Sequence, residues 1–174
     1  AIPSYISVLV WKGMFQPEGL VNELLGTDLN FLGDPTGAQI VVIFVNIWLG
    51  VPFMMMSLSG ALQALPNEMY EAAKLDGVSA WDTFRHLTLP NLKSALVPLS
   101  LLGFIWTFNM FNVIYLVSAG EPDSSTDILI SDAYRWAFSR GNRYGYASAY
   151  AVLIFFILYG YSKLGNKIAG RKTI

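Results

Sequence analysis

Stretches without any ionisable side chain divide this chain into long apolar segments and shorter polar connections. Three such stretches cover residues 35–67, 94–120 and 144–162. A helix rises about 1.5 Å per residue and the hydrocarbon core of a bilayer is about 30 Å thick, so each stretch is long enough, or nearly so, to cross a membrane. The pattern predicts three membrane-spanning helices over about residues 38–65, 91–118 and 144–163.

The first ten residues are apolar as well, but they are too few to cross a bilayer alone. Because Trp11 and Lys12 follow them, we expect residues 1–11 to be the end of a truncated span. The sequence opens at Ala1 without a methionine, and no charged stretch precedes an apolar core as it does in a signal peptide. These features predict the interior of a longer polypeptide.

Composition supports a membrane protein and excludes several other classes. The chain is 54% hydrophobic and 13% charged, which is too apolar for a soluble protein of 174 residues. The net charge of −1 argues against nucleic acid as a partner, because phosphate binding needs a basic surface. With no cysteine and one histidine, His86, we expect no metal site and no cofactor in this chain. The predicted fold class is an all-α, polytopic membrane protein.

Lysine and arginine are distributed unequally between the two sides of the predicted spans. Seven lie on the side of the 66–90 segment and the C-terminal tail: Lys74, Arg85, Lys93, Lys163, Lys167, Arg171 and Lys172. Four lie on the other side: Lys12, Arg135, Arg140 and Arg143. Since positive charge accumulates on the cytoplasmic side, the 66–90 segment and the C-terminus are predicted to be cytoplasmic. The connections 12–37 and 121–143 are then outside, and both are rich in Gly, Pro, Asp and Ser.

The 66–90 segment has the signals of two short helices. Asn67 is the expected N-cap of the first, and Gly77 is expected to end it. Ser79, with Asp82 three residues later, predicts the start of the second helix. Pro90 is expected to open the next span as a first-turn proline.

The letters EAAKLDGVSAWDTFRHLTLP, residues 71–90, resemble the EAA loop of bacterial ABC importer permeases. That pattern is EAA, three residues, Gly, nine residues, an aliphatic residue, one residue and Leu-Pro. It is matched here at Glu71, Ala72, Ala73, Gly77, Leu87, Leu89 and Pro90. The resemblance implies that the segment docks in a cleft of a separate ATP-binding subunit, where Glu71 faces a basic residue. The alternative for Glu71 is a local ion pair with Lys74.

The likeness extends beyond this loop to a branch of the family. NIWLGVPFMMMSLSGALQALP, WTFNMFNVIYLVSAGEP, DAYRWAF and YASAYAVLIFF look like the maltose-type permeases, first-subunit branch. The resemblance implies a fragment of a type I ABC importer transmembrane domain in the bacterial inner membrane. It also implies an ATP-binding subunit dimer that holds ATP and Mg²⁺, a second and different permease subunit, and an extracytoplasmic sugar-binding protein. The chain itself is then not an enzyme.

Two features inside the spans point to a solute site. Gly50 and Pro52 lie near the middle of the first full span, where a proline is expected to kink or unwind the helix. Such breaks at mid-depth mark substrate sites, although a packing kink is the alternative. In the second full span one helical face carries an aromatic ring, a hydroxyl and a small residue. These belong to Gly103, Trp106, Thr107 and Met110.

The maltose-type resemblance implies a sugar site at matching positions: Leu49, Gly50, Phe53, Gly103, Trp106, Thr107 and Met110. The chain departs from the pattern with Phe53 in place of tyrosine and Gly103 in place of serine. Thr107 and Met110 replace asparagines. These changes remove hydrogen-bonding groups, so trehalose, another oligosaccharide or glycerol phosphate stay open beside maltose and maltodextrin. Asn109 and Asn112 are expected to make hydrogen bonds between helices instead.

Other classes of protein fit less well. An ion-coupled secondary transporter or channel is expected to carry ionisable residues within its spans, and the three charge-free stretches have none. The GNKIAGRKT stretch, residues 165–173, has an arginine where a phosphate-binding loop has lysine, and no strand is predicted before it. Ser79, Asp82 and His86 are too close in sequence to form a catalytic triad. The acids Glu121, Asp123, Asp127 and Asp132 are expected to form a solvated outer surface or to contact a delivery protein.

Overall fold

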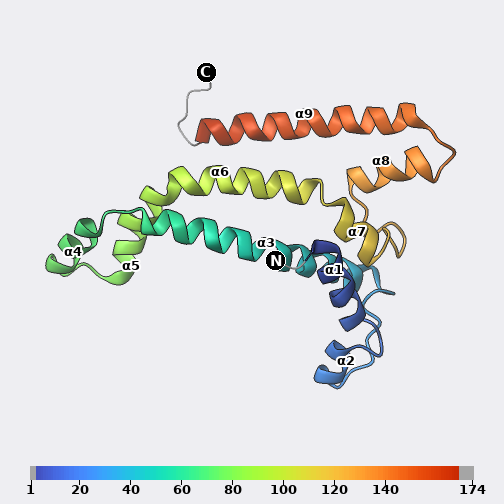
Figure 1. The fold of residues 1–174 in the computed structure, drawn as a ribbon, viewed down its shortest axis with the longest axis horizontal. Helices are drawn as coiled ribbons and strands as arrows, with labels where there is room; N and C mark the ends of the chain where they lie inside the picture. Colours follow the sequence, from blue (N-terminus) through green and yellow to red (C-terminus); the bar gives the residue numbers. More distant parts are fainter. Residues whose placement is uncertain (1–2, 169–174) are drawn as a thin grey trace. The chain divides into compact units, whose positions relative to one another are not determined.

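The computed structural model describes residues 3–168, and every regular element in that range is helical (Figure 1). This confirms the predicted all-α fold class. In chain order the elements are α1 Ser4–Met14, α2 Leu20–Leu25, α3 Pro35–Gln63, α4 Asn67–Leu75, α5 Ala80–Thr83, the π-helical turn η1 Phe84–Thr88, α6 Leu89–Phe108, α7 Phe111–Val117, α8 Leu129–Phe138 and α9 Tyr144–Ile168.

Three helical stretches are long and apolar enough to cross a membrane. They cover Pro35–Gln63, Ala80–Phe108 and Tyr144–Lys167. Most of their apolar side chains are exposed, including Ile40, Ile43 and Ile47 of α3. Exposed apolar surface of this extent suits lipid or further membrane helices rather than water. Arg171 and Lys172, which contributed to the predicted orientation, lie outside the described residues.

The described residues form two compact units, each with its own packing. The first contains residues 3–50 and 105–158, and the second contains residues 51–104 and 159–168. In the first unit, α1, α3 and α7 meet in a core of small branched side chains: Val8, Val41, Val42, Val45, Val113, Ile114 and Val117. β-Branched side chains lose little rotamer freedom on burial, which favours this close helix contact.

Helix α1 reaches further than the predicted end of a span at residue 11. It continues to Met14, and the Nζ atom of Lys12 donates a 3.1 Å hydrogen bond to the carbonyl oxygen of Leu116 in the last turn of α7. A cation at this end of a helix is stabilised by the helix dipole. Trp11 adds edge-to-face contacts with Phe44 and Trp48 of α3, at ring-centroid distances of 4.7 and 5.1 Å. Lys12 is therefore accommodated within the helix instead of ending it.

The second unit contains close contacts at glycines. A Cβ atom added at Gly103 would lie 2.6 Å from the Cε atom of Met54, and one added at Gly165 would overlap the side chain of Leu101. The ring of Phe104 stacks on Tyr161 with centroids 3.9 Å apart. Small residues that allow helices to approach closely are typical of membrane interfaces. Through these contacts the C-terminal parts of α3 and α9 pack against α6 within this unit.

The prolines of the spans interrupt the helices less than expected. Helix α3 continues through Pro52 from Pro35 to Gln63, so of the two expected outcomes, a kink or unwinding, the helix does not unwind at Gly50 and Pro52. Proline removes one backbone donor, and the remaining hydrogen bonds on either side maintain the helix. The predicted span over residues 91–118 does break, at a place the sequence did not suggest: α6 ends at Phe108 and α7 begins at Phe111.

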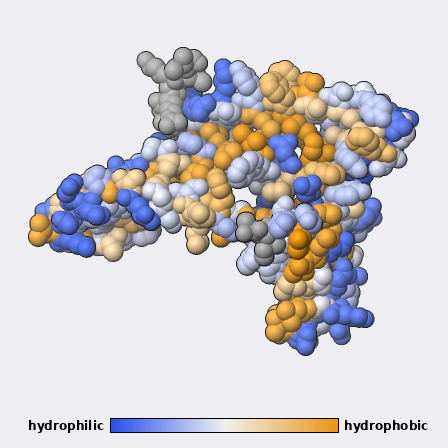
Figure 2. Space-filling view, viewed as in Figure 1, coloured by the Kyte–Doolittle hydropathy of each residue, from blue (hydrophilic) through white to orange (hydrophobic). Residues whose placement is uncertain are grey.

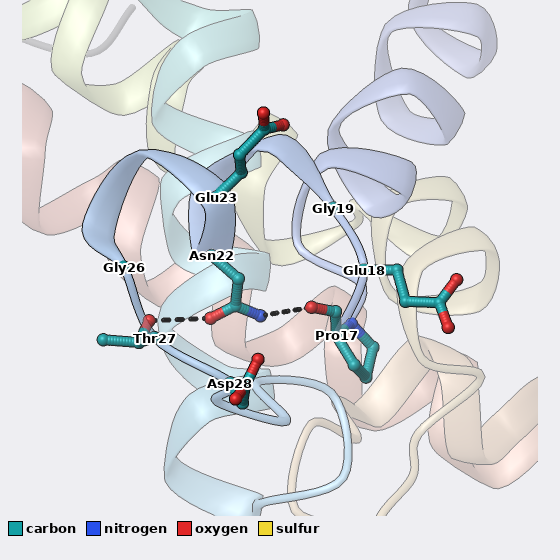
Figure 3. Close-up of a pocket in the computed structure, with 8 residues that line it drawn as sticks. All are labelled: Pro17, Glu18, Gly19, Asn22, Glu23, Gly26, Thr27 and Asp28. Atoms are coloured by element: carbon teal, nitrogen blue, oxygen red, sulfur yellow. Dashed lines mark hydrogen bonds between the residues drawn. The ribbon is translucent and has the colours of Figure 1, made fainter.

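The loop between α1 and α3 is organised by the amide of Asn22, which is only 3% exposed (Figure 3). Its Nδ2 atom donates to the carbonyl oxygens of Gln16, Pro17 and Leu29, at 3.3, 3.1 and 2.8 Å. Its Oδ1 atom accepts from the hydroxyl of Thr27 and from the backbone N–H of Leu29. One side chain therefore satisfies the backbone of a loop that has little regular structure.

The 66–90 segment contains two short helices, as predicted. Gly77 ends α4 with φ of +68°, and the N–H groups of Gly77 and Val78 donate back to the carbonyl oxygens of Lys74 and Ala73. This is a Schellman motif, which requires the left-handed backbone that glycine adopts freely. The hydroxyl of Ser79 accepts from the N–H of Asp82, which confirms Ser79 as the N-cap of α5. Asn67 is not an N-cap, because α4 begins at Asn67 and Pro66 precedes it without a side-chain cap.

No break separates the second short helix from the following span. Helix α5 continues through η1 into α6, and the N–H of Leu89 donates to the carbonyl oxygen of Phe84, five residues earlier. Pro90 lies in the first turn of α6, as predicted, where it has no N–H to donate. A π-helical turn widens the helix ahead of the proline ring, which would otherwise meet a carbonyl of the preceding turn. The second short helix of the 66–90 segment is thus joined to the span by continuous helix from Ala80 to Phe108.

The Asn22 hydrogen bonds make a prediction for the outer loop. Asn22→Leu removes all five bonds and leaves several carbonyl groups without their donor, each worth about 1–3 kcal/mol when buried. We expect the amides of residues 16–29 to exchange hydrogen at least about tenfold faster, measured by mass spectrometry on the purified full-length protein. Asn30→Ala is the matched control, because the exposed Asn30 amide accepts one bond, from Gly33. Equal exchange in both variants would contradict this organising role.

The left-handed turn at Gly77 makes a second prediction. A Cβ atom at Gly77 would meet nothing within 4 Å, so the cost of Gly77→Ala comes from the backbone alone, about 1–2 kcal/mol. We expect faster hydrogen exchange at the C-terminal end of α4. Gly60→Ala in α3 is the control, since Gly60 also has open space but lies inside a helix, where alanine is favoured by about 1 kcal/mol. Unchanged exchange in Gly77→Ala would contradict the strain argument.

Candidate functional site

The first candidate site is the surface of the 66–90 segment. Figure 2 shows hydrophilic side chains gathered over α4 and α5, with apolar ones scattered among them. Leu75 is 89% exposed and Trp81 is 66% exposed, and Val78 and Phe84 are also exposed. The rings of Trp81 and Phe84 stack with centroids 5.8 Å apart. Large apolar side chains in a polar rim are typical of a surface that contacts another protein.

The residues of the EAA pattern divide into exposed and structural positions. Glu71, Ala72, Leu89 and Pro90 are exposed, whereas Ala73 and Leu87 are half-buried. Ion pairs among the described residues all involve Asp127 or Asp132, so the alternative pairing of Glu71 with Lys74 is not formed. The carboxylate of Glu71 is left available at the surface, next to small side chains that allow close approach.

Side-chain hydrogen bonds stabilise both short helices of this segment. The hydroxyl of Tyr70 in α4 lies 3.1 Å from the Oγ1 atom of the buried Thr88 in η1. The ring of His86 contacts the carbonyl oxygen of Asp82 one turn earlier, and the hydroxyl of Ser79 donates to the Asp82 carboxylate. These are capping and intrahelical bonds, so these three side chains do not form the charge relay of a hydrolase.

The residues of the predicted sugar site are distributed over both units. Leu49, Gly50, Trp106, Thr107 and Met110 belong to the first unit. Phe53 and Gly103 belong to the second unit, where Gly103 is covered by Met54. Phe53 is exposed, and Trp106 is 47% exposed. The contacts of these residues are therefore described within each unit.

A break in the second span lies beside the first-unit residues. The N–H of Phe111 donates to the carbonyl oxygen of Asn109, and Met110 between them has φ of −77° and ψ of 59°, which is an inverse γ-turn. The Nδ2 atom of Asn109 donates to the carbonyl oxygen of Ile105, one turn back in its own helix. The Nδ2 atom of Asn109 is therefore used at the broken end of its own helix, while the interhelical bonds expected of Asn109 and Asn112 stay predictions. Irregular backbone within an apolar segment is tolerated where it lines a cavity or packs against protein.

A small pocket adjoins this break in the first unit. The Nδ2 atom of Asn46 in α3 donates a 3.2 Å hydrogen bond to the hydroxyl of Thr107 in α6. Around this pair lies an apolar cavity of about 160 Å³, lined by Val42, Ile43, Asn46, Thr107, Met110, Val113, Ile114 and Ile128. Ligand pockets are commonly about 300–1,000 Å³, so this cavity accommodates only part of a solute. We refer to it as the Asn46–Thr107 pocket.

Asn46 was missed in the sequence analysis, although a signal for it was present. Residues 46, 49, 50 and 53 fall at i, i+3, i+4 and i+7, which places Asn46 on the same helical face as Leu49, Gly50 and Phe53. An amide within a charge-free span is costly unless it is bonded, so it is a candidate for function. The pairing of Asn46 with Thr107 required the tertiary structure.

The acidic cluster of the other connection is largely neutralised by arginine. Asp127 forms an ion pair with Arg135, and Asp132 lies 3.1 Å from the Nη1 atom of Arg140. The hydroxyl of Tyr150 in α9 donates to Asp132 over 2.5 Å. Two of the four acids therefore fasten α8 to its surroundings, while Glu121 and Asp123 are exposed. The expectation that all four acids form a solvated surface is wrong for Asp127 and Asp132.

Comparison with known proteins identifies the family. Residues 1–167 match the family described as binding-protein-dependent transport system inner membrane component. The maltose/maltodextrin transport system permease protein MalF of Klebsiella aerogenes is 40% identical, over 91% of this chain and 34% of the relative. MalF of Escherichia coli K12 is 39% identical over the same shares. The chain thus spans about a third of the length of these relatives.

Solved structures agree on the fold. A bacterial ABC transporter involved in the import of the acidic polysaccharide alginate superposes with a TM-score of 0.86 at 23% identity, over 99% of this chain and 62% of that chain. The alginate transporter in complex with an alginate pentasaccharide-bound periplasmic protein gives a TM-score of 0.84 at 23% identity, over 99% and 63%. The three apolar helical stretches, the exposed 66–90 segment and the family match lead to one conclusion. This chain belongs to the family of inner membrane components of binding-protein-dependent transport systems.

Proposed function

We propose that this chain is part of a permease subunit of a bacterial ABC sugar importer. In this proposal it forms one side of the path for a maltose- or maltodextrin-like sugar. The similarity to MalF, at 40% identity with the Klebsiella aerogenes protein, is the observation that carries the sugar class. The chain catalyses no reaction, and ATP and Mg²⁺ bind to a dimer of separate ATP-binding subunits. A second, different permease subunit and an extracytoplasmic sugar-binding protein complete the importer.

The 66–90 segment is the proposed contact with the ATP-binding subunit. Its exposed Glu71 carboxylate supplies a charge for a basic side chain, and the exposed Leu75 and Trp81 supply apolar contact. Ala72 and Gly77 have small side chains or none, so the segment can approach the walls of a cleft closely. The helix is continuous from α5 through η1 to α6, so a movement of the segment is transmitted rigidly to the span. The proposed orientation places this segment and the C-terminus in the cytoplasm.

The proposed sugar contacts combine the predicted residues with Asn46. Leu49, Gly50, Phe53, Gly103, Trp106, Thr107 and Met110 are the positions inferred from the family. Asn46 and Thr107 add an amide and a hydroxyl that can exchange their mutual bond for bonds to a sugar. The ring of Trp106 offers an apolar face of the kind that stacks on a pyranose. A sugar that contacts these groups in one conformation and not in the other shifts the equilibrium between them.

Other solutes of the same transporter class remain the alternative to maltose. The Asn46–Thr107 pocket is almost entirely apolar, with two polar side chains and no charged one among its lining residues. A neutral sugar such as maltodextrin or trehalose suits this lining better than the charged glycerol phosphate. An ion-coupled transporter is disfavoured because residues 35–67, 94–120 and 144–162 carry no ionisable side chain.

Docking through Glu71 predicts that Glu71→Lys separates the permease from its ATPase. Reversing the charge places two cations together in the contact, and disruption of a paired charge at an interface costs about 2–5 kcal/mol. We expect the ATP-binding subunit to be lost when the full-length variant is purified from membranes, and sugar uptake to fall to background. Glu23→Lys is the control, since Glu23 is an exposed acid of α2 in the other unit. Retained association and uptake in Glu71→Lys would overturn the docking proposal.

The sugar contacts predict a defect in solute recognition for Thr107→Val. Valine has the shape of threonine without the hydroxyl, so one hydrogen bond to sugar is lost, about 0.5–1.5 kcal/mol. We expect KM for uptake by the assembled importer to rise by up to about tenfold, with normal amounts of protein in the membrane. Thr36→Val, at an exposed position in the first turn of α3, is the control.

The same assay separates the candidate solutes. Maltodextrin, trehalose and glycerol phosphate are each added to the complete complex with its binding protein, and tryptophan fluorescence and uptake are measured. We expect the response to maltodextrin to be the strongest. Absence of a response to every α-glucoside would overturn the maltose-like assignment while leaving the docking proposal intact.

A further inference from the structure

The turn between α8 and α9 brings two arginines to one aromatic ring. The guanidinium carbons of Arg140 and Arg143 lie 4.9 and 5.7 Å from the centre of the Trp136 ring. Arg143 also lies 5.9 Å from the ring of Tyr146, which stacks on Trp136 at 4.9 Å. Cations within about 6 Å of an aromatic face are held by its quadrupole. Both positive groups therefore lie within about 6 Å of the centre of the same ring.

The backbone fixes this arrangement. Gly141 and Asn142 have φ of +80° and +53°, so the chain reverses sharply between the two arginines. The N–H of Arg143 donates to the carbonyl oxygen of Trp136 over 2.9 Å, and that of Arg140 donates to Arg135 over 2.8 Å. These backbone bonds connect Arg140 and Arg143 to the end of α8.

Local carboxylates neutralise only part of this positive charge. Asp132 pairs with Arg140, and it also lies 3.9 Å from the Nε atom of Arg135. Asp127 pairs with Arg135. Arg143 takes part in none of the ion pairs among the described residues. Two acids and three arginines thus leave an excess of one positive charge in this cluster, and a guanidinium forms strong charge-assisted hydrogen bonds to anions.

The same turn lies at the end of a membrane-spanning helix. The apolar stretch of α9 begins at Tyr144, directly after Arg143. Around it Phe138 is 63% exposed, Tyr144 is 58% exposed and Tyr146 is exposed as well. Exposed aromatic side chains at the end of a span are typical of the level of lipid headgroups. The phosphate of a phospholipid is an anion that is present at this level.

We propose that Arg140 and Arg143, seated on Trp136, bind the phosphate of an anionic phospholipid headgroup at the α8–α9 end of the span. Two guanidinium groups donate charge-assisted hydrogen bonds to the phosphate oxygens. The aromatic side chains contact the adjoining glycerol and acyl region. This function is separate from sugar recognition and from ATPase docking. It also gives a reason for arginines on the side of the membrane where they are otherwise disfavoured.

The proposal is tested by titrating phosphatidylglycerol into the assembled transporter in detergent and following bound lipid by native mass spectrometry. We expect Arg140→Gln/Arg143→Gln to weaken the tightest lipid adduct at least about tenfold. Arg143→Gln alone leaves the Arg140–Asp132 pair intact, so it tests the site without disturbing α8. It is expected to weaken the same adduct severalfold, and Arg143→Lys less. Ser139→Ala, a neutral change in the same turn, is expected to bind lipid as the unmodified protein does.

Three results would overturn the proposal. Unchanged phosphatidylglycerol binding in both glutamine variants would exclude the arginines as the lipid site. Displacement of the adduct by an equal concentration of inorganic phosphate would identify a free anion site instead of a lipid site. Unchanged lipid binding together with weaker binding of the sugar-binding protein would assign the arginines to a protein contact. Retention of the adduct in Ser139→Ala, with its loss in Arg143→Gln, would support the lipid site.

Discussion

Backbone hydrogen bonding inside apolar segments is the constraint on which the rest of this structure depends. Hydrocarbon offers no partner for an N–H or C=O group, so every span must satisfy its own backbone, and the described residues do so with helix alone. Where the helical hydrogen-bond pattern is interrupted, nearby groups satisfy the freed backbone. The π-helical turn Phe84–Thr88 precedes Pro90, and the amide of Asn109 bonds the carbonyl of Ile105 where α6 ends. These local hydrogen bonds determine where the helix ends and where it continues.

The two proposed functional regions follow from how those interruptions differ. At η1 the helix changes its hydrogen-bonding pattern without ending, so α5, η1 and α6 form one continuous helical element. At Met110 the helix ends in an inverse γ-turn, which leaves space beside Thr107 for the Asn46–Thr107 pocket. One interruption preserves the continuity of the helix, and the other lies beside a cavity.

Two polar side chains of the first unit, Asn22 and Asp132, have a structural function. Asn22 satisfies five groups of the α1–α3 loop, and Asp132 joins Arg140 of the turn to Tyr150 of α9. In a low-dielectric environment such groups are stable only when each has its partner. Because Asp127 and Asp132 are used in this way, the acidic residues there do not form one uniform surface. The charge that is left over is positive and lies at Arg143.

The sequence by itself determined the helical membrane fold and the two short helices of the 66–90 segment. The signals for these features are local: long stretches without charged residues, a glycine at Gly77 that adopts positive φ, and the N-cap at Ser79. Each can be recognised from one short stretch of the chain. Sequence located neither the helix break at Met110 nor the partner of Asn46. Whether a proline or an asparagine interrupts a helix depends on which groups can satisfy the freed backbone, and those come from neighbouring turns and helices. Only the tertiary structure decided that Asn46 meets Thr107 and that Arg140 and Arg143 share one ring.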